Sequence, residues 1–343
     1  MANTGSWRVR VGRPFVSSTI KKFLHTIANE PGLDQGTICA AKAKFAASFK
    51  ERDECKGAQQ EDVGGPSCHV VTPDAGVGAE RGRFIFIHGG GWMLGDWPSH
   101  CRMLVDIVNA SKWTGLHVDY TLTPDATFDT AIQEVLRVCR QEYNTFHKPL
   151  CLVGNSVGGN IAIAVAEKLA SEGIPVAKQV LMWPVTDNTA SCMSWKTFSK
   201  GFFLSAEVQK WLLKAYVPKK AQRRLPHVSP LLASDQFLEK MPPTFIAVAG
   251  NDILRDEGVK FARRLDAVGV DVSLVMYPNT IHDWALLDPL ADTADTTALC
   301  RQVGAEIAAA HDARSEYLED ERPDALRVRW CVRARADRTS HGP

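Results

Sequence analysis

Apolar and polar positions follow two different rhythms along the chain. Short runs rich in β-branched and aromatic residues are typical of strands, and several of them are apolar at successive positions. These runs are 67–73, 83–90, 115–122, 149–156, 178–185, 244–252 and 272–278. Other runs repeat apolar residues every three or four positions, as on a buried helix face, and they are 19–29, 37–51, 126–143, 158–173 and 256–269. After residue 64 the two kinds alternate, which predicts an α/β fold with a mostly parallel sheet covered by helices on both faces.

Three segments fall outside this alternation. Residues 1–60 carry only helical patterns and predict an N-terminal helical segment. Residues 188–241 are too long for an ordinary crossover and contain an amphipathic helix rich in aromatic residues, so they are expected to form an insert or lid. Residues 312–343 change to an acidic and then Arg-rich composition and are expected to be a loosely ordered extension. The core then comprises 61–187 and 242–311.

Composition and charge narrow the class of protein. A chain of 343 residues with 45% hydrophobic residues can bury a sizeable core, and α/β folds reach this size as one unit. Lys plus Arg, 40, nearly balance Asp plus Glu, 39. The net charge of +1 therefore provides no field for holding a phosphate backbone or an anionic membrane, and nucleic acid is not an expected partner.

The cysteines, histidines and longest apolar runs bear on compartment and cofactors. The nine cysteines are odd in number and never stand in a C-x-x-C pair, so they are expected to be core residues and free thiols. No run in the sequence has the roughly 18 apolar residues of a membrane span. Residues 1–15 do not contain the apolar stretch of roughly 7 to 15 residues that a signal peptide requires. These features favour a reducing, cytoplasmic location. No histidine pair has metal-site spacing with a carboxylate, so we expect no metal and no cofactor.

The segment GNSVGG, residues 154–159, stands between a predicted strand and a predicted helix. A G-x-S-x-G motif in this context forms a sharp turn that exposes its serine, which makes Ser156 the candidate nucleophile. Gly154 and Gly158 lack the Cβ atoms that would obstruct a close approach of strand and helix.

The segment HGGGW, residues 88–92, follows another predicted strand. Its consecutive glycines indicate that backbone approaches something closely. We expect the N–H groups of Gly89 and Gly90, with that of Val157, to form an oxyanion hole, while Gly91 completes the loop and His88 holds it through a bond to backbone. A phosphate-binding loop is disfavoured because the sequence has no G-x-x-x-x-G-K-[ST] motif.

The candidate base and acid come later in the chain. His282 follows the last predicted strand, in the position where a Ser, acid, His order delivers the base. Asp252 ends the preceding strand, 96 residues after Ser156 and 30 before His282, and would orient the imidazole. Asp256 is the rival acid, but with Glu257 it stands in the first turn of a predicted helix, where we assign it a capping role.

In this order, the segments HGGGW, VDYTLTPD, GNSVGGN, NDILRDEG and IHDW resemble the hormone-sensitive-lipase-like branch of the α/β-hydrolase fold. The resemblance extends over about residues 62–310. It implies a serine esterase with the site residues named above, and a helical cap built from the N-terminal helices and the insert after the sixth strand. Asn155 stands where the family has Asp, Val157 where it has Ala, and TPD where it has A-P-E.

These assignments predict hydrolysis of an ester through an acyl-enzyme. Aromatic residues expected around the site favour an apolar or aromatic small-molecule ester or lactone as substrate; the candidate pocket residues are Trp92, Phe202, Phe203, Trp211 and Trp284. The resemblance also allows a tailoring step in secondary metabolism, such as a polyketide pathway. Two other functions stay open: acyl transfer or another non-hydrolytic reaction on a biosynthetic intermediate, and a non-catalytic small-molecule receptor, against which His282 argues. A homodimer is possible.

Overall fold

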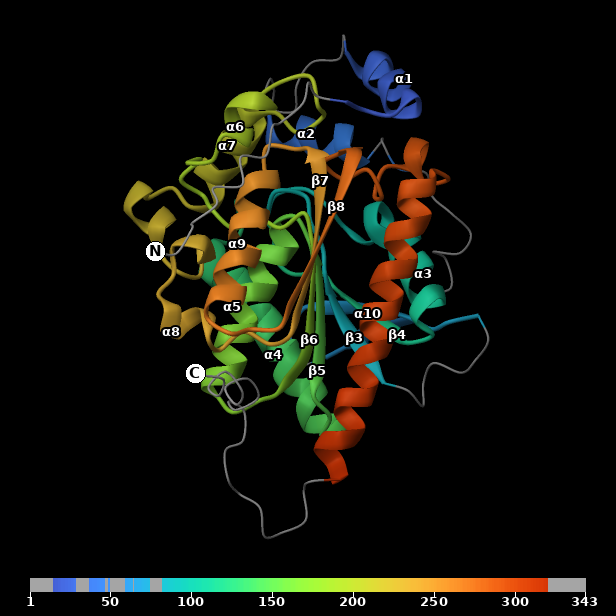
Figure 1. The fold of residues 1–343 in the computed structure, drawn as a ribbon, viewed down its shortest axis with the longest axis vertical. Coiled ribbons are helices and arrows are strands. Elements are labelled where there is room, and N and C mark those ends of the chain that lie inside the picture. The colour runs from blue at the N-terminus through green and yellow to red at the C-terminus, as the bar shows by residue number, and fades with distance from the viewer. Residues whose placement is uncertain are drawn as a thin grey trace, which may run out of the picture.

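An eight-stranded sheet lies at the centre of the computed structural model, which describes residues 15–28, 37–46, 49, 59–63, 65–74 and 82–319, with side chains as far as 310 (Figure 1). Its strand order is β1-β2-β4-β3-β5-β6-β7-β8. β2 is antiparallel to β1 and β4, and the other neighbours are parallel, which confirms the predicted mostly parallel sheet. The strands are β1 (Gln59–Asp62), β2 (Ser67–Val71), β3 (Arg83–Ile87), β4 (Thr114–Val118), β5 (Leu150–Asn155), β6 (Val176–Met182), β7 (Thr244–Asn251) and β8 (Val272–Ile281).

Helices cover both faces of this sheet because its central strands are apolar on both sides. Along β3, Ile85 and Ile87 enter one buried cluster while Phe84 and Phe86 enter the other, as the two-residue period of a strand requires. The first cluster is closed by α4 (Phe128–Phe146), α5 (Val157–Ser171) and α9 (Arg255–Ala267), and the second by α3 (Trp97–Ser111) and α10 (Ala294–Glu319). Figure 1 shows these two helical layers on opposite sides of the strands.

Several element boundaries differ from the predicted ones. β1 lies partly in the predicted N-terminal helical segment and its residues, QQED, are all polar, so no apolar pattern marks it. α3 was not predicted, although Asp96 caps it through the backbone N–H of Ser99. α10 continues to Glu319, beyond the predicted core boundary at 311, and the rest of the predicted extension lies outside the described residues.

Short helices gather at the carboxyl end of the parallel strands (Figure 1). They include α1 (Ser18–Ile27) and α2 (Ile38–Ala46) from the N-terminal segment, and α6 (Ser194–Thr197) and α7 (Ala206–Tyr216) between β6 and β7. α8 (Asp235–Leu238) lies apart from them, at the end of α9, where Asp235 binds Arg264 at 2.6 Å (Figure 1). Ala41 and Phe45 of α2 pack with Val208 and Leu212 of α7 and with Met93 from the loop after β3. The two segments predicted to form the cap are therefore in contact, and the cap as a unit stays a prediction.

The beginning of the insert is tied to the core by Glu257, which is fully buried in α9. Its carboxylate accepts hydrogen bonds from the backbone N–H groups of Thr186, at 2.8 Å, and Asp187, at 3.0 Å, and from the indole N–H of Trp195, at 2.9 Å. Burial raises the pKa of Glu257 to about 8, although these donors act in the opposite direction. Glu257 lies in the first turn of α9, as expected, and in addition fixes the beginning of the insert.

The cysteines only partly match expectation. Among the described residues, free thiols are found at Cys39, Cys68, Cys139, Cys192 and Cys300. Cys101 is disulfide-bonded, so the expectation of free thiols is wrong for this residue. No helix in the described ranges is both long and apolar enough to cross a membrane.

Candidate active site

Ser156 occupies the sharp turn between β5 and α5, with φ 53° and ψ −117°. A positive φ is strained for a residue with a side chain, and here its N–H is held by the carbonyl of Met182 at 2.8 Å. A Cβ at Gly158 would collide with the carbonyls of Ile87 and His88, so only glycine allows α5 to begin this close to β3. The turn therefore places the serine side chain at the carboxyl edge of the sheet.

Three predicted residues meet at this edge. The Oγ of Ser156 lies 3.0 Å from Nε2 of His282, and Nδ1 of His282 lies 2.7 Å from Oδ2 of Asp252. The other carboxylate oxygen of Asp252 accepts the N–H of Leu254 at 3.0 Å, which fixes the carboxylate after the end of β7. The exposed fractions of Ser156, His282 and Asp252 are 4%, 3% and 1%. This is the geometry of a nucleophile, a base and an orienting acid.

The charges around His282 favour its protonated form. Burial alone would lower the pKa of the imidazole, but the carboxylates of Asp252 and Asp283 outweigh burial and raise it to about 9. Asp283 directly follows the histidine, and one of its oxygens lies 3.7 Å from Nε2. His282 therefore faces a carboxylate at each ring nitrogen.

The glycine loop differs from prediction by one residue. The N–H of Gly89 donates to the side-chain oxygen of Asn155 at 2.8 Å and to Nε2 of His100 at 3.2 Å, so Gly89 is not available as an oxyanion donor. In the described part of the chain, the N–H groups of Gly90 and Gly91 donate to no other group. Both residues have positive φ, 103° and 64°, and the space that a Cβ of Gly91 would need is filled by Leu212 of α7.

The rings of His88 and Tyr120 bind backbone carbonyls of this loop. Nδ1 of His88 lies 2.8 Å from the carbonyl of Gly89, in agreement with the structural role expected for it, and the hydroxyl of Tyr120 donates to the carbonyl of His88 at 2.9 Å. Burial lowers the pKa of His88 to about 3 and that of His100 well below its ordinary value, so both rings are neutral near pH 7. The loop is thus fixed by uncharged groups.

Asp256 does not cap α9. No side chain caps that helix, and the Oδ2 of Asp256 instead accepts the N–H of Ser194 at 2.9 Å, at the beginning of α6. Asp256 lies in the first turn of α9, as predicted, but the capping role predicted for it is wrong, because its carboxylate binds Ser194 and Arg255 instead. Asp256 makes no contact with His282, whereas Asp252 does.

The residues predicted to line the substrate pocket are mostly packed in the interior. Trp92 is fully buried and stacks on Tyr216 of α7 at 4.2 Å between ring centroids. Trp284 is fully buried against Trp183, with centroids 4.4 Å apart. The other three predicted pocket residues, Phe202, Phe203 and Trp211, are partly buried among neighbouring apolar clusters.

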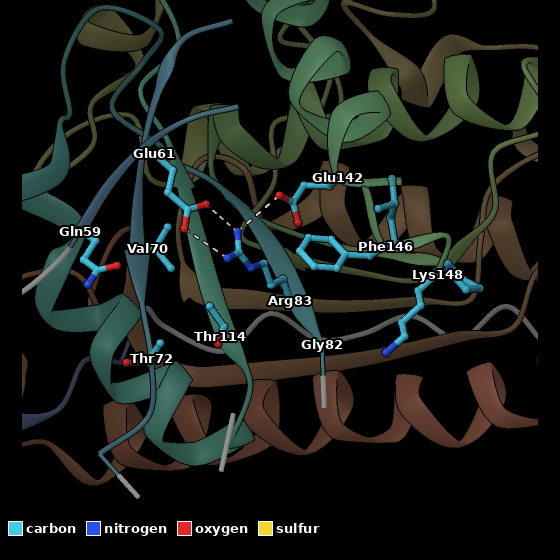
Figure 2. A pocket seen from close by; sticks show the side chains of 12 residues that line it. Gln59, Glu61, Val70, Thr72, Gly82, Arg83, Thr114, Glu142, Phe146 and Lys148 are labelled. Carbon is cyan, nitrogen blue, oxygen red and sulfur yellow. Dashed lines mark hydrogen bonds and ion pairs between the residues drawn. The ribbon is translucent and has the colours of Figure 1, made fainter. Parts of the chain in front are cut away.

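A cavity of about 280 Å³ opens at the opposite end of the sheet, near the amino ends of β3, β4 and β5 (Figure 2). Figure 2 shows Arg83 between Glu61 and Glu142 on its wall. Two nitrogens of Arg83 bind Glu61 at 2.8 and 3.2 Å, and one lies 3.5 Å from Glu142. None of the predicted catalytic or pocket residues lines this cavity, and its carboxylates Glu61 and Glu142 are bound to Arg83, so we do not assign ester chemistry to it.

Sequence analysis did not predict the contacts made by three residues near the triad, which are Asn155, Trp183 and Asp283. Asn155 was noted only as a departure from a family motif, yet its side chain holds Gly89. Asp283 is buried and binds the indole N–H of Trp183 at 2.8 Å. The signal that could have identified Asp283 is an acidic residue directly after the candidate base, within an otherwise apolar segment.

Comparison with known proteins agrees with this geometry. Residues 84–286, more than half of the chain, match the family described as the α/β hydrolase fold. The chain belongs to the α/β-hydrolase family. An esterase of Gibberella moniliformis is 33% identical to this α/β hydrolase over 217 residues, which are 61% of this chain and 68% of that protein. A protein of Pseudomonas putida named ethyl acetate hydrolase is 31% identical over 219 residues, 62% of this chain and 68% of that protein.

A solved structure extends the similarity. The crystal structure of a thermostable esterase from Pseudomonas putida is 35% identical, with a TM-score of 0.80 over 87% of this chain and 98% of that one. The match of family, fold and several named esterases identifies this α/β hydrolase as a serine ester hydrolase. The predictions of an α/β-hydrolase fold and of esterase activity are confirmed.

Proposed function

We propose that Ser156 is the nucleophile, His282 the general base and Asp252 the orienting acid in the hydrolysis of a carboxylic ester. The observation that carries this proposal is the continuous hydrogen-bonded chain from Ser156 Oγ through His282 to Asp252, at 3.0 and 2.7 Å. The order of the three residues along the chain and their positions after β5, β7 and β8 support it.

In this proposal, Nε2 of His282 accepts the proton of Ser156 while Oγ attacks the ester carbonyl. The N–H groups of Gly90, Gly91 and Val157 bind the oxyanion that forms, aided by the amino end of α5. The protonated His282 then gives its proton to the leaving alcohol. Water attacks the acyl-enzyme with His282 again as base and releases the acid.

We further propose that the substrate is a small apolar ester with a short acyl group. Ser156 and His282 expose 4% and 3% of their surfaces, and Trp92, in the loop after β3, is wholly buried against Tyr216 of α7. Such an enclosed nucleophile leaves little room for a long acyl chain. The relative named ethyl acetate hydrolase supports a short acyl group. The intact triad geometry favours catalysis over a receptor role.

The test is steady-state hydrolysis of p-nitrophenyl esters from acetate to palmitate, with and without alcohol acceptors, by the wild type and by Ser156→Ala. We expect kcat/KM to be highest for acetate or butyrate and to fall with chain length. Activity that rises toward palmitate would refute the short-acyl proposal. Transfer to the alcohol that exceeds hydrolysis would favour acyl transfer instead.

A further inference from the structure

The carboxylate of Asp283 lies between two groups of the site. Its Oδ1 accepts the indole N–H of Trp183 at 2.8 Å, and its Oδ2 faces Nε2 of His282 at 3.7 Å. That nitrogen is the one that lies 3.0 Å from the Oγ of Ser156. Only 5% of Asp283 is exposed. A buried carboxylate beside the reactive nitrogen is not required by a Ser–His–Asp arrangement, which already has its acid at Nδ1.

The backbone holds Asp283 and Trp183 in strained conformations. Their φ angles are 57° and 38°, both in the left-handed region of backbone conformation that residues other than glycine rarely adopt. The carbonyl of Asp283 accepts the N–H groups of Leu286 and Leu287 at 2.8 and 3.0 Å, and the N–H of Trp183 donates to Ala247 at 2.6 Å. Such strain persists only where the surroundings impose it, and it concentrates at functional sites. The bond between Trp183 and Asp283 thus joins two strained residues from different strand ends.

The charged and polar groups around the pair explain why a carboxylate is tolerated there. His282 is influenced by Asp252, Asp283 and the more distant Glu257, and Asp283 by His282, Trp183, Asp252 and the Asn155 amide. Burial raises the pKa of Asp283, while His282, Trp183 and Asn155 favour its charged form. An acidic residue at 155 would repel Asp283, so the neutral Asn155 is compatible with a carboxylate at 283.

We propose that Asp283 is a positioning residue for His282: through Trp183 and its own charge, it holds the ring from the Nε2 side and sets the pH range in which the ring is neutral. This inference rests on the proposed function of His282. Asp252 orients the ring from Nδ1, and Asp283 acts from the opposite edge. Loss of the charge at 283 makes His282 easier to deprotonate, so the base stays neutral at lower pH.

Asp283→Asn is the decisive variant. Asn keeps the shape and the acceptor for Trp183, and it accepts a left-handed φ as readily as Asp, so the fold is retained. We expect the acid limb of the kcat/KM profile to move to lower pH by about one to three units, the usual effect of a charge at this range. Asp256→Asn is the matched control, since it removes a carboxylate from the same region without contact to His282, and its acid limb stays unchanged.

A second readout does not depend on turnover. The titration of the His282 ring is followed by NMR in Ser156→Ala, with and without Asp283→Asn, and the same shift to lower pH is expected. If Ser156→Ala stays active, the proposed function fails, and the NMR shift still tests Asp283. If Ser156→Ala is inactive and neither readout moves in Asp283→Asn, the inference on Asp283 is overturned. Should that variant unfold, Trp183→Phe replaces it, with an expected fall in kcat of about 10-fold; an unchanged kcat overturns the inference.

Discussion

The two ends of the sheet differ in how their charged side chains are paired and in where strained backbone occurs. At the amino end, Arg83 is held by Glu61 and Glu142, and the left-handed residues Lys112 and His147 are ordinary C-caps of α3 and α4. At the carboxyl end, left-handed backbone occurs at Ser156 and at residues 92, 183 and 283, which are neither glycine nor helix C-caps. Paired charges stabilise the first end, whereas at the second end strained backbone surrounds an imidazole whose pKa is raised by two carboxylates. The difference separates a structural polar cluster from a reactive one.

The largest expected effect is that of Ser156→Ala. Removal of the nucleophile should lower kcat for ester hydrolysis by about 10⁶, with the melting temperature nearly unchanged, because alanine fits the same turn. The measurement is single-turnover kinetics on a p-nitrophenyl ester with a thermal melt of the same sample. A variant that keeps most of its activity would refute the covalent mechanism and place the chemistry elsewhere.

Asp252→Asn should have the next largest effect, a fall in kcat of about 10⁴, because the ring loses the partner that fixes its tautomer. Asp256→Asn, the matched variant, should change kcat little and cost about 1 kcal/mol of stability through the weakened bond to Ser194. Steady-state kinetics and melts on both variants decide between the two acids. The assignment is wrong if Asp256→Asn is the inactive one.

Arg83→Ala tests the other end of the sheet. It leaves the buried Glu142 without its cation and should cost about 3 kcal/mol of unfolding free energy, with kcat within about twofold of the wild type. Arg140→Ala is the control, because Arg140 binds Glu172 with two hydrogen bonds on the exposed surface, where a pair contributes about 0 to 1 kcal/mol. Denaturant titrations give both values. Equal losses in the two variants, or a large fall in kcat for Arg83→Ala, would erase the contrast between the ends.

The smallest expected effect is a loss of stability in acid. In the folded state His88 has a pKa of about 3, so between pH 7 and 5 only the unfolded chain gains the proton. Stability therefore falls as the pH drops below about 6.5, by about 2 kcal/mol at pH 5 from this residue. Denaturant titrations at pH 7, 6 and 5 measure it, and His88→Gln should reduce the slope. A pH-independent free energy of unfolding would contradict the neutral, buried state.

Sequence analysis succeeded where position along a strand decides the outcome. The proximity of Ser156, Asp252 and His282 could be predicted because each follows a strand of a parallel sheet, and carboxyl ends of parallel strands share one edge. Their catalytic roles stay a prediction. It failed where a side chain from elsewhere in the chain decides. Gly89 and Gly91 look alike in HGGGW, and only the hydrogen bond that the N–H of Gly89 donates to the side-chain oxygen of Asn155 shows which N–H is already used.

Other differences have the same origin. Asp256 stands at a helix start, but the partner that it binds, Ser194, comes from the insert. The aromatic residues of the insert are partly buried among apolar clusters, and pattern alone does not separate a pocket wall from packing. Trp92 is buried because Tyr216, 124 residues later, stacks on it. Contacts between distant segments are absent from any local pattern.

Leu212 and Gly91 are far apart in the sequence, yet the contact between them means that a substitution at one position restricts what the other can accept. Glycine is needed at 91 for its positive φ and also because Leu212 occupies the place of a Cβ. A library randomised at 91 alone should therefore return glycine almost exclusively, whatever ester is used for selection. A smaller residue at 212 would free the space that a Cβ at position 91 needs, but the positive φ at position 91 would still favour glycine. Attempts to reshape this enzyme for bulkier esters should vary α7 first and keep the glycine loop constant.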